Sequence, residues 1–117
     1  MKLPIQSVQR KAQEYVDANG RSPFREWLVS IKDVRSQAKI TKAIAQMEAG
    51  NFGDHKAIVN APGLYEKRLH YGPGFRIYYI TEGDRLIVLL AGSDKSNQKS
   101  AIACAKRYLR NFRQQQN

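Results

Sequence analysis

The chain has 117 residues, enough for one domain with a hydrophobic core and too few for two. Its 20 Lys and Arg residues against 10 Asp and Glu give a formal net charge of +10, so a polyanion such as nucleic acid is the expected partner. A single cysteine, Cys104, excludes an internal disulfide and a zinc knuckle, as is typical of the reducing cytoplasm. Because no apolar run approaches 18 residues and the N-terminus lacks a signal-peptide pattern, we expect a soluble, cytoplasmic protein without a membrane segment.

The first element, within residues 5–16, has the weakest pattern of the chain. Val8, Tyr15 and Val16 mixed with polar residues suit an edge strand, although residues 12–14 would also tolerate a helix. Asn19 and Gly20 then break the chain.

Two helices are predicted between residues 22 and 50. Ser22 followed by Pro23 is a typical helix start, and Asp33 caps the second helix, which ends near Gly50. Apolar stripes are formed by Phe24, Trp27, Leu28 and Ile31 in the first helix and by Ile40, Ala43, Ile44 and Met47 in the second. We therefore expect a helical hairpin that covers one face of a sheet, with Trp27 in the core.

A β-hairpin is predicted from residue 64 to residue 80, after a loop over residues 51–63. Two β-rich runs flank the breaker Gly72-Pro73-Gly74. Because side chains alternate along a strand, Arg68 and Arg76 fall on the same face of neighbouring strands if the register permits. Two like charges repel each other there, so an anionic ligand is the simplest explanation. The alternative is a solvated face that merely carries arginines.

A third strand and a last helix complete the pattern. Residues 86–91 are continuously apolar, which indicates a strand covered on both faces. The helix is expected from about residue 96 to residue 112, with residues 114–117 frayed. Its apolar face would hold Ile102, Ala105, Leu109 and Phe112, and a basic stripe would hold Lys99, Lys106, Arg110 and Arg113.

The residues that could carry chemistry are basic and aromatic, and the sequence shows no metal-binding pattern. His55 and His70 are the two histidines, and no carboxylate cluster accompanies them, so we expect no metal and no other cofactor. No nucleophile elbow and no phosphate-binding loop motif occur. Basic residues near strand ends, interleaved with tyrosines, instead indicate binding of single-stranded nucleic acid.

Five motifs follow one another between about residue 20 and residue 105. They are Ser22-Pro23-Phe24-x-x-Trp27-Leu28, Gly50-Asn51-Phe52-Gly53-Asp54-His55-Lys56, Glu66-Lys67-Arg68-Leu69, Gly72-Pro73-Gly74-Phe75-Arg76-Ile77-Tyr78-Tyr79 and Leu90-x-Gly92-x-Asp94-Lys95-Ser96-x-Gln98. Together they resemble the RelE/HigB-like superfamily, and more narrowly its addiction-module killer protein branch. The resemblance implies one α+β domain over residues 1–117, with an N-terminal strand, a helical hairpin, an antiparallel three-stranded meander and a C-terminal helix.

The resemblance also implies a function. Such proteins are toxins of bacterial or phage-derived type II toxin–antitoxin systems, and cut mRNA on the ribosome as metal-independent endoribonucleases (mRNA interferases). The implied partner is a helix-turn-helix antitoxin encoded by a neighbouring gene. Two alternatives stay open: a ParE-like poison of DNA gyrase, which shares this fold, and an inactive relative that only binds an antitoxin or nucleic acid.

The motif match also implies roles for single residues. Arg76 would hold the scissile phosphate during attack by the ribose 2′-OH, and Arg68 would assist from the next strand. Arginine does not deprotonate in proteins, whereas lysine can when neighbouring positive charges lower its pKa. Lys95 is therefore the candidate for proton transfer, with Lys67 or His70 as substitutes. RNA contacts are expected from Lys56, Lys67, His70, Tyr78 and Lys99.

The chain departs from the family pattern at three places. Ser96-Asn97-Gln98-Lys99 stands where better-known members carry a tyrosine in the early turns of the last helix. Lys67 replaces a residue that is usually apolar in this branch, and Ser93 replaces a glycine.

Overall fold

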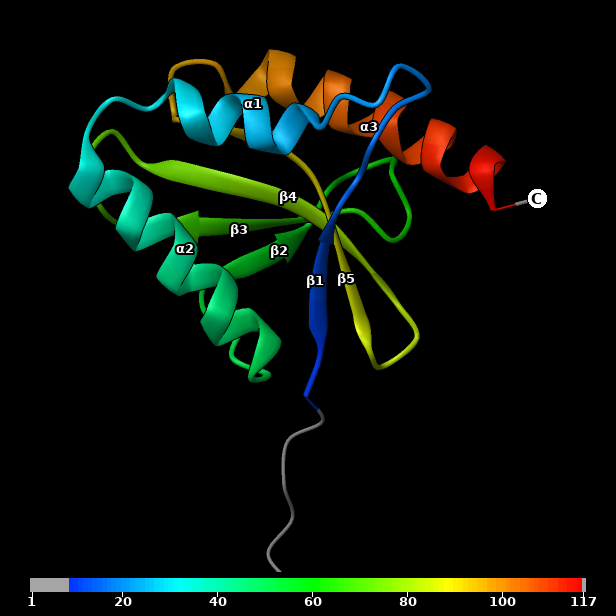
Figure 1. The fold of residues 1–117 in the computed structure, drawn as a ribbon, viewed down its shortest axis with the longest axis horizontal. Coiled ribbons are helices and arrows are strands. Elements are labelled where there is room, and N and C mark those ends of the chain that lie inside the picture. Colours follow the sequence, from blue (N-terminus) through cyan, green and yellow to red (C-terminus); the bar gives the residue numbers. More distant parts are fainter. Residues whose placement is uncertain (1–8, 117) are drawn as a thin grey trace, which may run out of the picture.

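The computed structural model describes residues 9–116 and arranges them as a five-stranded sheet with helices on both faces (Figure 1). The strands are β1 (Lys11–Glu14), β2 (His55–Ala57), β3 (Tyr65–Leu69), β4 (Phe75–Glu82) and β5 (Leu86–Ser93), and the helices are α1 (Pro23–Ser30), α2 (Val34–Glu48) and α3 (Gln98–Gln115). The strand order is β1-β5-β4-β3-β2, with β1 parallel to β5 and the other pairs antiparallel. The predicted α+β class, the helical pair and the β3–β4–β5 meander are confirmed.

Two sequence-based predictions of element boundaries are wrong. The predicted loop over residues 51–63 contains β2, whose three residues are all exposed and therefore show no apolar pattern. The tail predicted to fray is helical through Gln115, whose Nε2 donates a hydrogen bond to the carbonyl of Val16 at 3.1 Å. Val8 of the predicted first strand and Asn117 of the tail lie outside the described residues.

The strand β1 forms one edge of the sheet, as predicted for this part of the chain. Two outward N–H groups at this edge are already used. The N–H of Arg10 donates to the carbonyl of Glu48, and the N–H of Ala12 donates to Oε2 of the same residue, each at 2.8 Å. The C-terminal end of α2 therefore closes this edge of the sheet.

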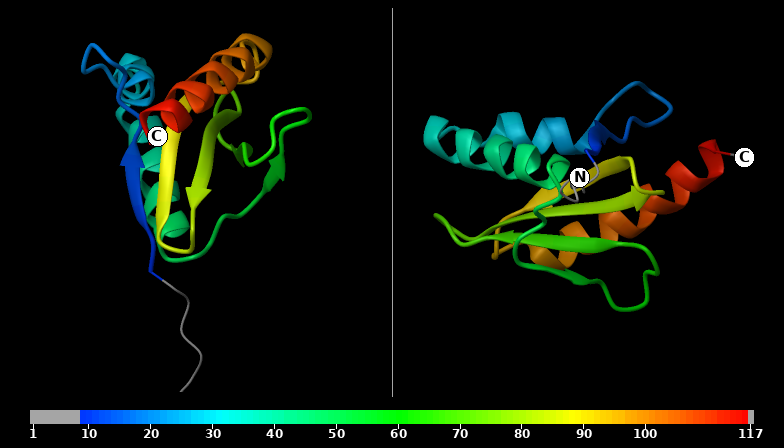
Figure 2. Two further views of the ribbon diagram at one scale, coloured as in Figure 1. Left: turned by 90° about the vertical axis from the view of Figure 1, so that its right-hand side faces the viewer. Right: turned by 90° about the horizontal axis from the view of Figure 1, so that it is seen from below.

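Both predicted helix starts are confirmed by their caps. The Ser22 hydroxyl accepts a hydrogen bond from the N–H of Arg25 at 3.0 Å, with Pro23 at the first helical position. The Asp33 carboxylate accepts from the N–H of Arg35 and from the Ser36 hydroxyl at the start of α2. These local signals fix the helical pair that covers one face of the sheet (Figure 2).

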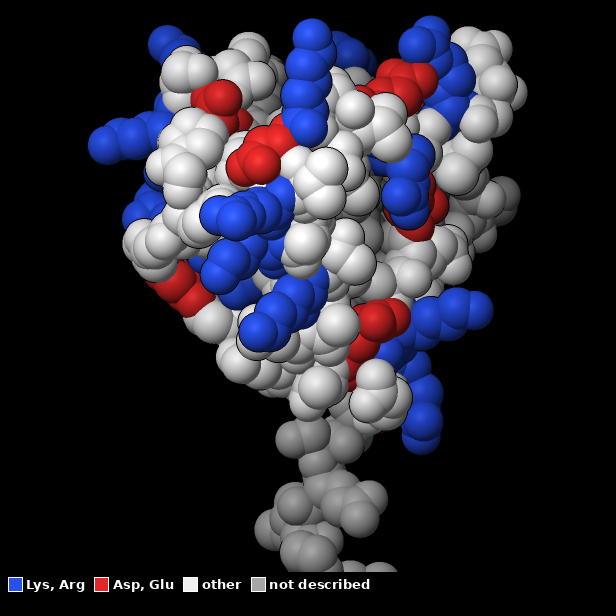
Figure 3. Space-filling model, turned by 60° about the vertical axis from the view of Figure 1, so that its left-hand side comes forward, with Lys and Arg blue, Asp and Glu red and all other residues white. Residues whose placement is uncertain are grey.

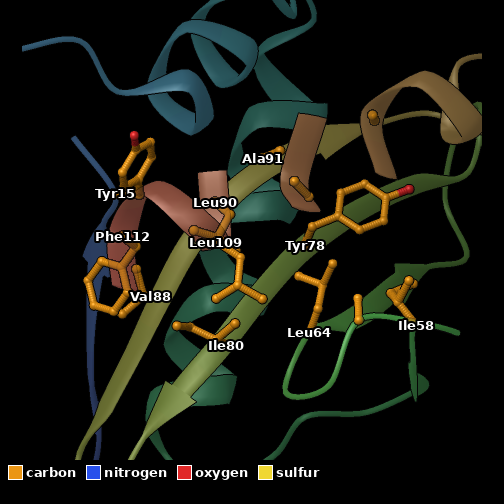
Figure 4. Close-up of a cluster of buried hydrophobic side chains, with 13 residues drawn as sticks. Tyr15, Ile58, Leu64, Tyr78, Ile80, Val88, Leu90, Ala91, Leu109 and Phe112 are labelled. Atoms are coloured by element: carbon orange, nitrogen blue, oxygen red, sulfur yellow. The ribbon is translucent and has the colours of Figure 1, made fainter. Parts of the chain in front are cut away.

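The sheet is buried on both faces, which gives two hydrophobic cores. The core under α3 is drawn in Figure 4 and includes Tyr15, Ile58, Leu64, Tyr78, Ile80, Val88, Leu90, Leu109 and Phe112. The core under α1 and α2 includes Phe24, Leu28, Ile40, Met47, Phe75, Ile77, Tyr79, Ile87 and Leu89. The prediction that residues 86–91 form a strand covered on both faces is confirmed.

A β-bulge changes which side chains of β5 face α3. Tyr78 pairs with Ala91 and Tyr79 pairs with Leu89, so Leu90 has no partner of its own on β4. Leu90 and Ala91 consequently both pack in the α3 core. Beyond the bulge the alternation is reversed, which brings Ser93 to the α3 side, where its hydroxyl lies 3.0 Å from the hydroxyl of Tyr78.

The same reversal turns Gly92 toward α1. A Cβ at Gly92 would lie only 2.0 Å from a ring atom of Trp27, so the indole packs directly on the glycine backbone. The ring also contacts Phe24 and Phe75, with centroids 5.6 and 6.1 Å away. Trp27 is half-buried and packs against the α1/α2 core, in line with its predicted structural role.

The contact between Gly92 and Trp27 gives a first test. Gly92→Ala should destabilise the protein by about 1–3 kcal/mol because the methyl group displaces the indole. Trp27→Ala should cost about 3 kcal/mol or more through the cavity it leaves. In the double variant the alanine at position 92 should cost almost nothing further. Denaturant unfolding of the four proteins measures this coupling, and strictly additive losses would show that the two residues do not interact.

Candidate functional site

The two predicted arginines lie directly opposite each other at one end of the sheet. Arg68 on β3 is the register partner of Arg76 on β4, and Arg76 in turn pairs with Ser93 on β5. All three lie on the sheet face that α3 covers. The prediction that the arginines share one face of adjacent strands is confirmed.

A buried carboxylate lies between these arginines. Glu66 is fully buried; its Oε1 accepts a hydrogen bond from Nε of Arg68 at 2.9 Å, and its Oε2 accepts from Nε2 of Gln98 at 2.7 Å. Nε of Arg76 is 3.7 Å from Oε2. We call Glu66, Arg68, Arg76 and Gln98 the arginine cluster. An external anion, the simplest explanation from the sequence, is not required to hold the two arginines together, because Glu66 supplies a negative charge between them.

Electrostatics keep the cluster ionised. Burial alone would raise the pKa of Glu66, but the hydrogen bonds from Arg68 and Gln98 outweigh it and hold that pKa below its ordinary value. The hydrogen bond to Glu66 raises the pKa of Arg68. Within the cluster one carboxylate faces two guanidinium groups, and two further carboxylates act on the arginines from outside it, Asp54 on Arg68 and Asp94 on Arg76.

Arg76 is the more buried of the two arginines, with only 9% of its surface exposed. The alternative of a solvated face that merely carries arginines is therefore wrong for Arg76, because α3 covers this face of the sheet. Nη1 of Arg76 donates to the carbonyl of Gly74 at 2.9 Å, whereas its buried Nε has no hydrogen-bond acceptor among residues 9–116. The Arg68 side chain is about one-third exposed, and Nε is the only one of its nitrogens that bonds a described residue.

The loop after β3 lies against Lys95. Gly74 has φ +79°, which favours glycine, and a Cβ built on it would lie 3.6 Å from both Nη1 of Arg76 and Cβ of Lys95. The N–H of Lys95 also donates to the carbonyl of Pro73 at 3.3 Å. The hairpin loop thus brings the backbone and Cβ of Lys95 close to the loop residue that Arg76 bonds.

The N-terminus of α3 reaches the same place through Gln98. Asn97 caps this helix of 18 residues without a side-chain hydrogen bond to it, because its Oδ1 accepts from the N–H of Asp94 at 3.1 Å instead. The carboxylate of Asp94 lies just before this helix and accepts a hydrogen bond from the N–H of Ser96 at 2.8 Å. Lys99, predicted to contact RNA, is exposed in this first turn.

Two predicted RNA contacts are wrong because their side chains are buried. Tyr78 is 0% exposed, bonds the Ser93 hydroxyl, and has its pKa raised to about 12, chiefly by burial. It cannot stack on a base. Lys67 lies on the opposite face of β3 from the arginine cluster, where it is 6% exposed and donates to the carbonyl of Phe52 at 3.1 Å. Burial lowers the pKa of Lys67.

His70 and Lys56 are both exposed, on either side of the arginine cluster. His70 follows β3, and its Nε2 lies 2.6 Å from Oδ2 of Asp54, an interaction across 16 residues that the sequence pattern did not indicate. That hydrogen bond lowers the pKa of Asp54. Lys56, on β2, pairs with Glu66 of β3.

A basic groove of about 380 Å³ lies between α2 and β3. Its charged lining consists of Lys39, Lys42, Asp54, Lys67, Arg68 and His70. Figure 3 shows Lys and Arg side chains gathered on the side of the molecule that comes forward from the left of Figure 1. Arg68 therefore belongs both to the arginine cluster and to this groove.

The part of the chain that the structure describes contains no group of three His, Cys, Asp or Glu side chains placed to hold a metal ion. Within the same residues, no helix combines the length and the apolar character needed to cross a membrane.

Comparison of the sequence with known proteins identifies the family of this chain. Residues 26–110, from α1 to the last turns of α3, match the phage-derived protein Gp49-like family (DUF891). The chain belongs to this family. Gp49-like proteins are candidate toxins of toxin–antitoxin systems. The chain is also 40% identical over 83 residues to an uncharacterized protein of Haemophilus influenzae (strain ATCC 51907 / DSM 11121 / KW20 / Rd), covering 71% of this chain and 82% of the relative. The region matched to the family contains the whole arginine cluster.

Removing the carboxylate of the arginine cluster gives a second test. Glu66→Ala leaves two guanidinium groups side by side without their anion and should lower the free energy of unfolding by about 3 kcal/mol or more. Glu82→Ala, at the exposed end of β4, is the matched control and should change it by less than about 0.5 kcal/mol. Equal effects of the two substitutions in denaturant unfolding would mean that Glu66 does not hold the cluster together.

The pH dependence of stability tests the same carboxylate. Because the pKa of Glu66 is lower in the folded state, its contribution is complete above the unfolded value of about 4.3 and is lost as the pH falls through the folded value. Below about pH 5 the parent should therefore lose stability more steeply than Glu66→Gln. Parallel curves for the two proteins would exclude Glu66 as a source of the acid sensitivity.

Proposed function

We propose that this Gp49-like protein is the toxin of a type II toxin–antitoxin system and acts as a metal-independent endoribonuclease. The observation that carries the proposal is the pair of arginines on neighbouring strands at the N-terminus of α3, with the Arg68 side chain about one-third exposed and Arg76 more deeply buried behind it. A phosphodiester placed there would meet guanidinium groups from two strands and the helix N-terminus together.

The proposed reaction is attack by the ribose 2′-oxygen on the adjacent phosphorus. The O2′–P bond forms and the P–O5′ bond breaks, leaving a 2′,3′-cyclic phosphate and a free 5′-hydroxyl. The 2′-OH gives up a proton and the departing 5′-oxygen gains one. Negative charge increases on the phosphoryl oxygens during attack, and Arg76 and Arg68 would stabilise it.

Two groups flank the arginines and could carry the two proton transfers. His70 carries an imidazole, the side chain that most often acts as a general base, and the Asp54 carboxylate lies 2.6 Å from its Nε2 and orients the ring. Lys95 is exposed and its Cβ lies near Gly74, the residue whose carbonyl Arg76 bonds, and its amino group would supply the proton to the 5′-oxygen. In this scheme Lys95 and His70 both act, rather than one replacing the other.

The wider biological setting also belongs to the proposal. The order of the five motifs supports membership of the RelE/HigB-like superfamily, with mRNA on the ribosome as substrate and the cytoplasm as location. The net charge of +10 supports both a nucleic-acid substrate and an acidic segment in the partner, a helix-turn-helix antitoxin encoded by a neighbouring gene.

Arg76→Ala tests the phosphate-binding role. Cleavage of mRNA should slow by about 100- to 1000-fold, as measured by mapping new 5′-hydroxyl ends in expressing cells, and growth arrest should disappear. Because Arg76 is buried, the variant should also lose stability, so it is compared at equal soluble protein. Arg76→Lys keeps the charge without the planar fork and should recover only part of the activity. Arg85→Ala, on the exposed β4–β5 turn, is the control and should behave like the parent.

Growth arrest by Arg76→Ala equal to that of the parent would overturn the ribonuclease assignment. Arrest by the parent without new mRNA ends, but with DNA breaks that depend on gyrase, would replace it with the gyrase-poison alternative.

The Asp54–His70 pair predicts a pH profile. If His70 accepts the proton, the cleavage rate of the parent should rise with pH and then level off, because a general base acts in its unprotonated form. His70→Ala should lower the rate by about 100-fold and remove that rise, and Asp54→Asn should lie between the two. Single-turnover cleavage on programmed ribosomes measures the profile. An unchanged rise in His70→Ala would assign the step to another group.

A further inference from the structure

The two edges of the sheet differ in how their backbone groups are satisfied. At β1, Glu48 accepts from the outward N–H groups of Arg10 and Ala12. At β2, the opposite edge, no helix among residues 9–116 takes this role, and all three residues of the strand are exposed. One edge of the sheet is closed and the other is open.

The ladder register shows which backbone groups of β2 are free. The N–H of Arg68 donates to the carbonyl of Asp54 at 2.8 Å, and the N–H of Ile58 donates to the carbonyl of Leu64 at 2.9 Å. In an antiparallel pair, alternate residues bond the neighbour, so residues 54, 56 and 58 face β3. The N–H and C=O groups of His55 and Ala57 therefore point outward, as the template for one more strand.

An aromatic cleft of about 210 Å³ lies beside this edge, on the α2 face of the sheet. Its lining residues are Arg10, Phe52, His55, Tyr65, Tyr79 and Thr81. The ring of Tyr79 stacks with those of Phe52 and Tyr65, at centroid distances of 5.6 and 5.8 Å. The Arg10 guanidinium lies 5.3 Å from the Phe52 ring centroid. Val59, just after β2, is 78% exposed.

We propose that the outer edge of β2 and this aromatic cleft together bind an extended acidic segment of a partner protein. The segment adds a strand beside His55 and Ala57 and places an aromatic or aliphatic side chain in the cleft. Lys56 in the strand and Arg10 at the cleft select acidic side chains in the segment.

Charge excludes a second copy of this chain as the occupant. Two β2 edges brought together would place Lys56 opposite like charge on a protein whose formal net charge is already +10. Nucleic acid fits less well, because outward backbone donors and acceptors match a peptide ladder. The cleft also lies on the other sheet face from the arginine cluster. The inference therefore stands independently of the proposed ribonuclease activity.

The test uses a synthetic seven-residue peptide in which glutamate alternates with tyrosine and valine. Binding to the full chain is measured by fluorescence anisotropy, and backbone amide exchange is followed by NMR. The peptide should bind in the micromolar range and slow exchange of the His55 and Ala57 amides. Ala57→Pro removes an outward N–H but no ladder bond to β3, and should weaken binding at least about tenfold. Ala57→Ser keeps that N–H and should bind like the parent.

Two charge-reversal variants, one at the cleft and one away from it, test the proposal even if Ala57→Pro disturbs folding. Arg10→Glu should weaken binding about tenfold, whereas Lys32→Glu, with the same charge change between α1 and α2, should not. Arg76→Ala should bind the peptide like the parent, which separates this site from the proposed catalytic one. The inference is overturned if the peptide fails to bind, if Arg10→Glu has no effect, or if slowed exchange misses His55 and Ala57. Slowing of those two amides by self-association or by an RNA oligonucleotide would also overturn it.

Discussion

The end of the sheet that carries the candidate site depends on one interaction, the buried carboxylate of Glu66 between Arg68 and Arg76. Without it, the register that aligns β3 with β4 would place two guanidinium groups side by side with no compensating charge. Gln98 bonds the same carboxylate from α3 and so ties the helix N-terminus to the strands. Glu66 thus holds the two guanidinium groups side by side, while the Arg68 side chain stays about one-third exposed. The interaction that stabilises the fold therefore also orients the groups that we propose to bind phosphate.

Local irregularities in the backbone give this site its shape. The bulge at Leu90 reverses the alternation of β5, so Ser93 faces Tyr78 on the α3 side and Gly92 receives the Trp27 ring on the other. A regular strand would exchange these two positions. The hairpin loop similarly depends on Gly74, because its φ of +79° is a backbone conformation that favours glycine. Helical packing on one face and site geometry on the other are thus set by the same few residues of β5.

The sequence predicted the features that rest on short-range periodicity. Alternation placed Arg68 and Arg76 on one face, and the Ser22 and Asp33 caps gave the helix starts. It did not predict burial of that face, because Glu66 and its arginines look like a solvated strand until α3 covers them. Tyr78 lies on the same face, and its ring was therefore predicted to be accessible to RNA although α3 buries it. The Asp54–His70 pair was missed because it joins residues that are 16 positions apart in the sequence. The strand β2 was missed because all its residues are exposed and it has no apolar face.

The central claim is that the arginine cluster binds the phosphate of an RNA strand, and NMR of the guanidinium groups tests it most directly. A short 2′-O-methyl RNA lacks the attacking hydroxyl and forms a complex that cannot react. As this RNA is added, the ¹⁵N signals of Arg76 and Arg68 should shift together and saturate at the same concentration as overall binding. The Arg85 signal, from an exposed arginine on the β4–β5 turn, should stay in place. Saturated binding that leaves the Arg76 and Arg68 signals unchanged would contradict the account.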